Sequence, residues 1–66
     1  MAFSVKQARN YAGYTQVEMA KKLGISRDAY RRIEKNPEIT PIQIAVQISA
    51  VTGISIDKIF FSQKST

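Results

Sequence analysis

Hydrophobic residues recur every three or four positions along most of the 66-residue chain, which is the spacing of amphipathic α-helices. The pattern is most regular over residues 15–35, where it predicts two short helices joined by a tight turn. The apolar face of the first helix is formed by Val17, Met19, Ala20 and Leu23. The apolar face of the second is formed by Ala29, Tyr30 and Ile33. We expect the two apolar faces to pack together and the opposite faces to contact solvent.

Capping signals place the ends of both helices of this pair. Thr15 is followed three residues later by Glu18, which is the form of a capping box at a helix start. Gly24 comes directly after the last apolar position, where a left-handed residue commonly ends a helix. Ser26 is a favourable N-cap for the second helix. The sequence therefore predicts a helix-turn-helix over about residues 15–35.

The outer face of the second helix is cationic. It is formed by Arg27, Asp28, Arg31, Arg32 and Lys35. A helix of this kind, packed by its apolar back on the preceding helix, is how a helix-turn-helix presents its recognition helix to the DNA major groove. Double-stranded DNA is therefore the first candidate partner of this face.

Two further helices flank the pair. Ser4 followed by Gln7 forms a second capping box, and the helix that it opens is expected to end at Gly13. The other helix has Thr40 as its expected N-cap and Pro41 at its first position, and it runs to about residue 52.

A fifth helix is predicted after Gly53, with Ser55 as its N-cap. The residues expected to close the core from this helix are Ile56, Ile59 and Phe60. Only the brief segment 54–56 alternates as a strand would. The predicted fold is therefore all-α, with five helices in one domain over residues 1–66 and a frayed tail at about 63–66.

The helix over about residues 41–52 has two apolar stripes. One stripe contains Ile44, Ala45, Ile48 and Val51. The other contains Ile42, Val46 and Ala50. Two interpretations are open: a central helix buried on two sides, or a helix whose second stripe contacts a second copy of the chain in a dimer.

Arg9 lies on the edge of the inner face of the first helix of the chain. An unpaired guanidinium is costly to bury, so we expect a carboxylate partner. Glu34, on the inner edge of the recognition helix, is the only carboxylate so placed. The alternative is that the two charges are solvated separately.

The formal net charge is +5 and the pI is about 9.9, which favours a polyanionic partner. Six Lys and Arg side chains lie between Lys21 and Lys35, against only Asp28 and Glu34. Most of the excess charge therefore belongs to the predicted recognition helix and its neighbour.

The chain has no cysteine and no histidine, which excludes zinc sites built on these residues and histidine-based acid–base catalysis. The five carboxylates do not form an evident catalytic pair, so we expect no enzymatic activity, no metal and no cofactor. No apolar run approaches the length of a signal-peptide core or a membrane span, and we expect a cytoplasmic protein without membrane association.

One spaced set of residues points to a known family. The set is Gln16, Ala20, Gly24, Ile25, Ile33, Glu34 and Pro41, and its spacing resembles the Cro/repressor-like helix-turn-helix proteins, also called the Xre family. Residues 53–60 are similar to the closing turn and last helix of that family. The resemblance implies a compact five-helix, lambda-repressor-like domain. It also implies an arginine–glutamate pair at the positions of Arg9 and Glu34.

The resemblance further implies a small transcriptional repressor or regulator of a bacterial or phage setting. Because one recognition helix gives limited specificity, we expect a homodimer on a palindromic double-stranded operator. We expect no small-molecule ligand, because the chain has no room for a separate sensing domain. The rival class is a protein-interaction module on the same fold, such as an antitoxin or a coactivator-type adaptor.

Four side chains are the first candidates for DNA contacts. Gln16, at the amino end of its helix, is expected to clasp a phosphate, with a solvated surface amide as the alternative. Arg27 is expected to bind O6 and N7 of a guanine, worth about 1–3 kcal/mol of discrimination, with a phosphate contact as the alternative. Of Arg31 and Arg32, one is expected to contact a base and the other a phosphate.

Asp28 is the one acidic residue of this face. Its expected role is to brace Arg31 or Arg32, and the alternatives are to accept from N4 of a cytosine or to interact only with the helix dipole. Ser26 is expected to contact a phosphate in addition to capping the helix, and Lys35 to contact the DNA backbone.

Overall fold

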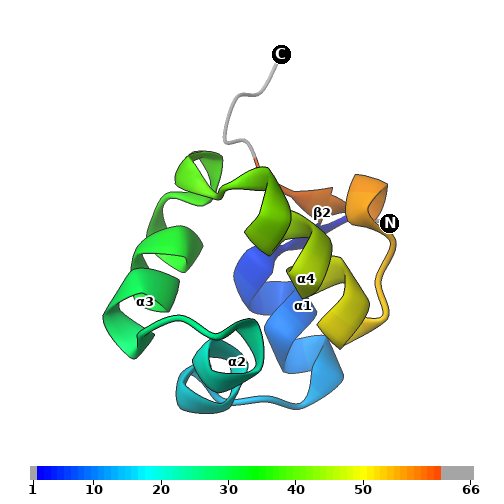
Figure 1. Ribbon diagram of the computed structural model, residues 1–66. Coiled ribbons are helices and arrows are strands. Elements are labelled where there is room, and N and C mark those ends of the chain that lie inside the picture. The colour runs from blue at the N-terminus through cyan, green and yellow to red at the C-terminus, as the bar shows by residue number, and fades with distance from the viewer. Residues whose placement is uncertain (1, 62–66) are drawn as a thin grey trace.

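The computed structural model describes residues 2–61, in which four α-helices and a short parallel strand pair are joined by brief turns (Figure 1). The elements in chain order are β1 (Phe3–Ser4), α1 (Val5–Ala12), α2 (Gln16–Leu23), α3 (Arg27–Lys35), the 3₁₀ turn η1 (Pro37–Ile39), α4 (Ile42–Thr52), the 3₁₀ turn η2 (Ile56–Lys58) and β2 (Ile59–Phe60). The expected frayed tail at 63–66 lies outside the described residues.

Both predicted capping boxes are present. The Ser4 hydroxyl accepts a hydrogen bond from the backbone N–H of Gln7 (3.0 Å), and the Gln7 side chain accepts one from the Ser4 N–H (2.9 Å). Thr15 and Glu18 exchange the same two bonds at the start of α2 (3.1 and 2.9 Å). The Ser26 hydroxyl accepts a hydrogen bond from the backbone N–H of Ala29, the third residue of α3 (3.1 Å). The sequence therefore predicted the starts of the first three helices correctly.

The turn between α2 and α3 depends on a left-handed residue. Gly24 has φ +72°, which a side chain at this position would disfavour. In this conformation the N–H of Ile25 reaches back to the carbonyl of Ala20 (3.0 Å), so that the chain reverses sharply at the end of α2. Ile25 then packs against the core. The turn thereby fixes the angle at which α3 leaves α2.

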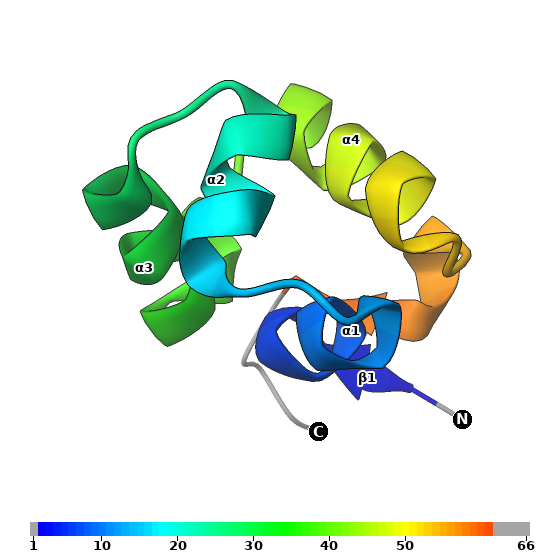
Figure 2. The ribbon, with the colours of Figure 1, turned by 90° about the horizontal axis from the view of Figure 1, so that it is seen from below.

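The core lies between the four helices, and each helix contributes one of its largest fully buried side chains, which are Val5, Met19, Tyr30 and Ile48. α2 packs mainly on α3, and α1 packs mainly on α4. In both views α3 lies at the outer side of the molecule, with one face against α2 (Figures 1 and 2). Its opposite face is therefore open to a large ligand.

The predicted all-α fold of five helices is wrong at the carboxyl end. The described part of the chain has four α-helices, and the segment expected to form the fifth is one 3₁₀ turn followed by β2. β2 pairs in parallel with β1, Phe3 opposite Ile59 and Ser4 opposite Phe60. Ser55 does not cap a helix, because its hydroxyl donates to the Asp57 carboxylate instead. Ile59 enters the core, whereas Phe60 is 56% exposed.

Smaller corrections concern the start of α4 and two side chains. α4 begins at Ile42 with Pro41 at the capping position, so the prediction that Thr40 caps it is wrong. The Thr40 hydroxyl instead donates to the carbonyl of Pro37 (2.6 Å). Val17 and Ile56, which were predicted to be buried, are exposed.

The second apolar stripe of α4 faces solvent within the described structure. Ile42 is 72% exposed, Val46 is 53% exposed, and Ala50 is also exposed. The buried side of the helix is formed by the first stripe, in which Ala45 and Ile48 are buried. The interpretation of α4 as a helix buried on two sides is therefore wrong. We call Ile42, Val46 and Ala50 the α4 stripe.

Candidate nucleic-acid interface

A buried hydrogen-bonded cluster around Glu34 holds the recognition helix in place. Arg9 Nε donates to Glu34 Oε2 at 2.6 Å, and the Tyr30 hydroxyl donates to the same oxygen at 2.6 Å. Gln16 Nε2 donates to Glu34 Oε1 at 3.0 Å. Arg9 Nη1 also donates to the carbonyl of Tyr14 at 2.8 Å. We call Arg9, Gln16, Tyr30 and Glu34 the Glu34 cluster; it joins α1, α2 and α3 at one point.

The sequence predicted one bond of this cluster, between Arg9 and Glu34, and the structure contains it. The side chains of the two residues are only 10% and 8% exposed. Tyr30 and Gln16 were not predicted as further donors to the carboxylate. The available signal was spacing, because Tyr30 precedes Glu34 by four residues on one helix, where side chains meet.

The cluster shifts the pKa values of its members. Burial alone would raise the pKa of the Glu34 carboxyl, but the hydrogen bonds from Arg9, Tyr30 and Gln16 outweigh it and hold that pKa below its ordinary value. The pKa of Arg9 is raised, chiefly because its guanidinium donates to Glu34. Burial, followed by the hydrogen bond to Glu34, raises the pKa of the Tyr30 hydroxyl far above its ordinary value. Arg9 and Glu34 are therefore both charged at neutral pH and form an ion pair within the cluster.

The lowered pKa of Glu34 predicts an acid-dependent loss of stability. A carboxyl whose pKa is lower in the folded state stabilises the fold fully above the unfolded-state pKa, near 4.5, and loses this contribution as the pH falls through the folded-state pKa. We expect the free energy of unfolding of the wild type to fall below about pH 4.5. In Glu34→Gln the decline should be smaller, so the two proteins should converge at low pH. Urea unfolding between pH 3 and 7 tests this, and parallel curves would contradict it.

The residues predicted to contact DNA lie on the exposed surface, with one partly buried exception. The exposed members are Ser26, Arg27, Asp28, Arg31, Arg32 and Lys35. Gln16 is half-buried because its amide is bound to Glu34. The buried Tyr30 and Ile33 fix the opposite side of α3 in the core, so the charged side can only point outward.

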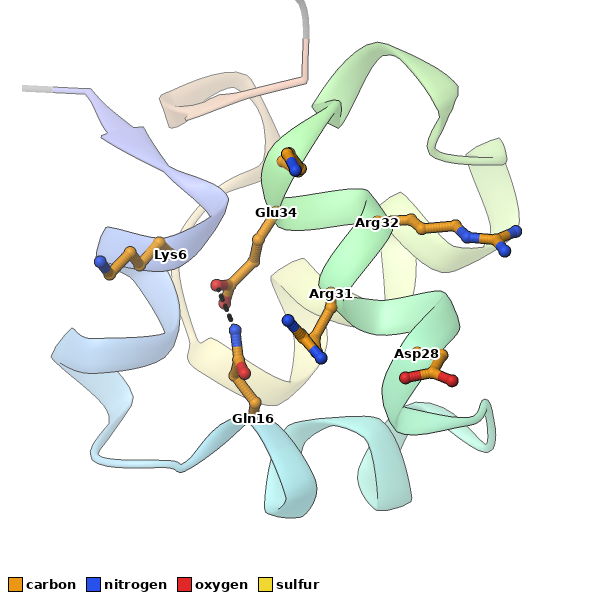
Figure 3. A pocket seen from close by; sticks show the side chains of 7 residues that line it. Lys6, Gln16, Asp28, Arg31, Arg32 and Glu34 are labelled. Atoms are coloured by element: carbon orange, nitrogen blue, oxygen red, sulfur yellow. Dashed lines mark hydrogen bonds between the residues drawn. The ribbon is translucent and has the colours of Figure 1, made fainter.

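A hollow of about 490 Å³ opens between α1, the start of α2 and α3 (Figure 3). Its lining residues are Lys6, Gln16, Asp28, Arg31, Arg32, Glu34 and Lys35. We call it the basic hollow. It brings together five of the seven residues predicted to contact DNA and leaves out Ser26 and Arg27, at the start of α3. It also includes Lys6, which the sequence analysis did not single out.

The acidic residue on the exposed face of α3, Asp28, does not brace an arginine in this structure. Within the described residues, Asp28 forms no ion pair with Arg31 or Arg32. Figure 3 shows the Arg31 guanidinium directed toward Gln16, whereas the Arg32 side chain extends the other way along the outer surface. The bracing expected for Asp28 is therefore not formed, and its place in the first turn of α3 is the one favourable to the helix dipole.

The described part of the chain contains neither a metal-binding cluster nor a membrane-spanning helix. No cluster of three or more Asp, Glu, Cys or His residues suited to a metal ion is present there. None of the helices described has the length and apolar character needed to cross a membrane.

Two helices joined by a left-handed glycine turn, with the second exposed and cationic, define a helix-turn-helix protein. The chain belongs to the Xre-type helix-turn-helix family: a family model described as helix-turn-helix matches residues 5–59. This is a family of DNA-binding transcription regulators and not a class of enzyme.

Curated relatives agree with this assignment. The chain is 32% identical over 63 residues, 94% of its length, to the HTH-type transcriptional regulator SinR of Bacillus subtilis, and it spans only 57% of that relative. The HTH-type transcriptional regulator SinR of Bacillus licheniformis has the same identity to the chain over the same shares of both sequences. The chain is also 35% identical over 60 residues to an uncharacterized HTH-type transcriptional regulator of Methanocaldococcus jannaschii, covering 91% of both chains. No solved structure gives a significant match.

Proposed function

We propose that the chain is a sequence-specific double-stranded DNA-binding transcription regulator, most simply a cytoplasmic repressor, that inserts α3 into the major groove. The observation that carries the proposal is the exposed cationic face of α3, held rigidly from behind by the Glu34 cluster. A base-reading helix must be positioned accurately, and three hydrogen bonds to one buried carboxylate provide that accuracy. The relatives named as transcriptional regulators support the same function.

Arg27 is the side chain proposed to read a base. It occupies the first position of α3, is exposed, and lies outside the basic hollow. An arginine fork matches O6 and N7 of guanine. Arg31 lies beside Gln16 in the hollow, so we assign these two to phosphates and Arg32, which extends away from them, to a base edge.

The remaining members of the interface are assigned to support these contacts. Ser26 and Lys35, at opposite ends of α3, are proposed to contact phosphates on either side of the groove. Asp28 is proposed to interact favourably with the dipole of α3, since it forms no ion pair with the arginines one turn on within the described structure.

Duplex binding as a function of salt tests the proposed function. Four phosphate contacts by one copy of the chain predict that the logarithm of the association constant falls with the logarithm of the salt concentration at a slope on the order of −4. Fluorescence anisotropy with a labelled duplex, titrated between low and physiological ionic strength, measures this slope. A protein that fails to bind duplex DNA even at low ionic strength would contradict the proposal.

We further propose that two copies of the chain meet through the α4 stripe on a palindromic operator. The stripe is exposed, and α4 carries no charged residue over Ile42–Thr52. A two-fold interface brings the same residues of both copies together, so a charge-free apolar stripe is well suited to it. Three side chains bury much less area than a stable dimer needs, so the dimer is expected to form on DNA and not in free solution.

A charge placed in the α4 stripe should abolish cooperative binding. We expect Val46→Glu to lose cooperativity between two half-sites, typically a factor of about 5–150, while its affinity for one half-site is unchanged. Gln47→Glu adds the same charge at the neighbouring exposed position, away from the stripe, and should bind like the wild type. Titration of one-site and two-site duplexes separates the two effects. Equal cooperativity in both variants would exclude the α4 stripe as the dimer contact.

The exposed α4 stripe also favours a second candidate function, a protein-interaction module such as an antitoxin or a coactivator-type adaptor. In that case the partner would be a different protein bound to the same apolar residues. The salt titration separates the two functions, because only the DNA-binding regulator predicts a steep slope with duplex DNA.

A further inference from the structure

A lysine outside the helix-turn-helix shares the basic hollow with the recognition helix. Lys6 belongs to α1, is exposed, and lines the hollow together with Gln16 and Arg31. Figure 3 shows it on the wall opposite α3, with its ammonium end directed away from the Gln16–Glu34 hydrogen bond. No ion pair to any other described residue engages Lys6. Its charge is therefore available to a ligand.

The hollow is cationic overall once the partners of its carboxylates are taken into account. Lys6, Arg31 and Arg32 contribute three positive charges to it. Of its two carboxylates, Glu34 is already paired with Arg9, which leaves Asp28 as the carboxylate without an ion pair among the described residues. A concave surface with an excess of one sign of charge concentrates counter-ions of the opposite sign. The hollow therefore suits an anion.

The positions of Lys6 and Gln16 indicate what kind of anion the basic hollow suits. The two residues come from different helices and line the same hollow next to α3, so they offer two anion contacts along one surface. A DNA strand presents a row of phosphates, and a strand whose phosphate contacts Gln16 would carry its neighbouring phosphates past α1. A flexible ammonium suits a single phosphate oxygen and does not require the planar geometry of base recognition.

We propose that Lys6 binds a backbone phosphate of the DNA strand that contacts Gln16, so that the DNA-binding surface extends from the helix-turn-helix onto α1. The inference rests on the proposed function and adds a contact to it. The contact is to the backbone, so it increases affinity for all sequences and does not select among them.

Lys6→Gln tests this contact through the salt dependence of binding. We expect the variant to bind all duplexes more weakly, with their ranking unchanged, and the salt slope to become shallower by about 1. The side chain is exposed near the start of α1, where a positive charge is not favoured by the helix dipole, so the variant should fold normally. Urea unfolding checks that it does.

Lys58→Gln is the matched control, because it removes the same charge from an exposed residue of η2, away from the basic hollow. The slope of this variant should equal that of the wild type. Lys6→Arg, which keeps the charge, should retain the wild-type slope as well. If Lys6→Gln and Lys58→Gln change the slope equally, Lys6 acts only through net charge and the inference is wrong.

Ethylation interference identifies the phosphate and separates this inference from the proposed function. Wild-type protein should show a phosphate at which ethylation blocks binding, and this interference should disappear in Lys6→Gln while the others persist. An identical interference pattern in both proteins would overturn the Lys6 contact and leave the proposed function intact. Wild-type protein that binds no duplex would overturn both.

Discussion

Glu34→Ala is expected to lower the free energy of unfolding by about 3–5 kcal/mol, because removing one partner of a buried ion pair leaves the other buried without compensation. Arg9 is 8% exposed and Tyr30 is fully buried, so both donors would lose the oxygen that accepts from them. Small domains have about 5–15 kcal/mol of stability in total. We therefore expect a variant that is partly or wholly unfolded at 25 °C, measured by circular dichroism and urea titration.

Two variants make this expectation specific to the Glu34 cluster. Glu38→Gln removes a carboxylate that is exposed in η1 and should change stability by less than about 0.5 kcal/mol. Glu34→Leu combined with Arg9→Leu removes both charges and should be more stable than Glu34→Ala, because neither charge is left unpaired. A loss of less than about 1 kcal/mol in Glu34→Ala would show that the cluster does not hold the three helices together.

Arg27→Ala is expected to flatten base discrimination at one operator position, with a loss of about 1–3 kcal/mol in affinity for the preferred sequence. The arginine lies at the exposed start of α3, where its fork can reach a guanine edge. Affinities for a panel of duplexes that differ at single positions measure the effect. The preference should disappear at one position and persist at the others.

Arg27→Lys is the matched control for the loss of charge. Lysine keeps the positive charge but lacks the planar fork that forms two parallel hydrogen bonds, so discrimination should fall although the salt slope is preserved. If Arg27→Ala weakens binding to every duplex by the same factor, Arg27 contacts a phosphate and the base assignment is wrong.

Local signals in the sequence predicted the first three helices well. The capping boxes at Ser4 and Thr15 and the glycine stop at Gly24 act within a few residues of the helix end, so they operate whatever the rest of the chain does. The Arg9–Glu34 pair was also predictable, because a charge on an inner helix face requires a partner and only one was in place.

The carboxyl end could not be predicted by the same signals. β2 has two residues and is formed by pairing with β1, at the other end of the described chain, so it leaves no periodic pattern in its own sequence. The α4 stripe was ambiguous for a related reason. An apolar stripe shows only that a surface is hydrophobic, and whether it is covered depends on the elements packed against it. Within residues 2–61 a fifth helix does not form, and the stripe is exposed.

In the candidate site, the sequence supplied the residue types but not their grouping. The exposed face of α3 followed from helical periodicity. The grouping of Lys6 and Gln16 in one hollow depends on how α1 packs against α2 and α3, which spacing along the chain does not encode. For the same reason, the sequence places Asp28 one helical turn from Arg31 and Arg32, although it pairs with neither in the structure described for residues 2–61.

Selection of bound sites from a pool of random duplex DNA tests the central claim most directly. An outward-facing α3 that reads bases, used by two copies of the chain, predicts enrichment of a two-fold symmetric sequence with half-sites about one helical turn apart. Selection that enriches no sequence over the starting pool, at an ionic strength low enough for any cationic protein to bind, would contradict the account.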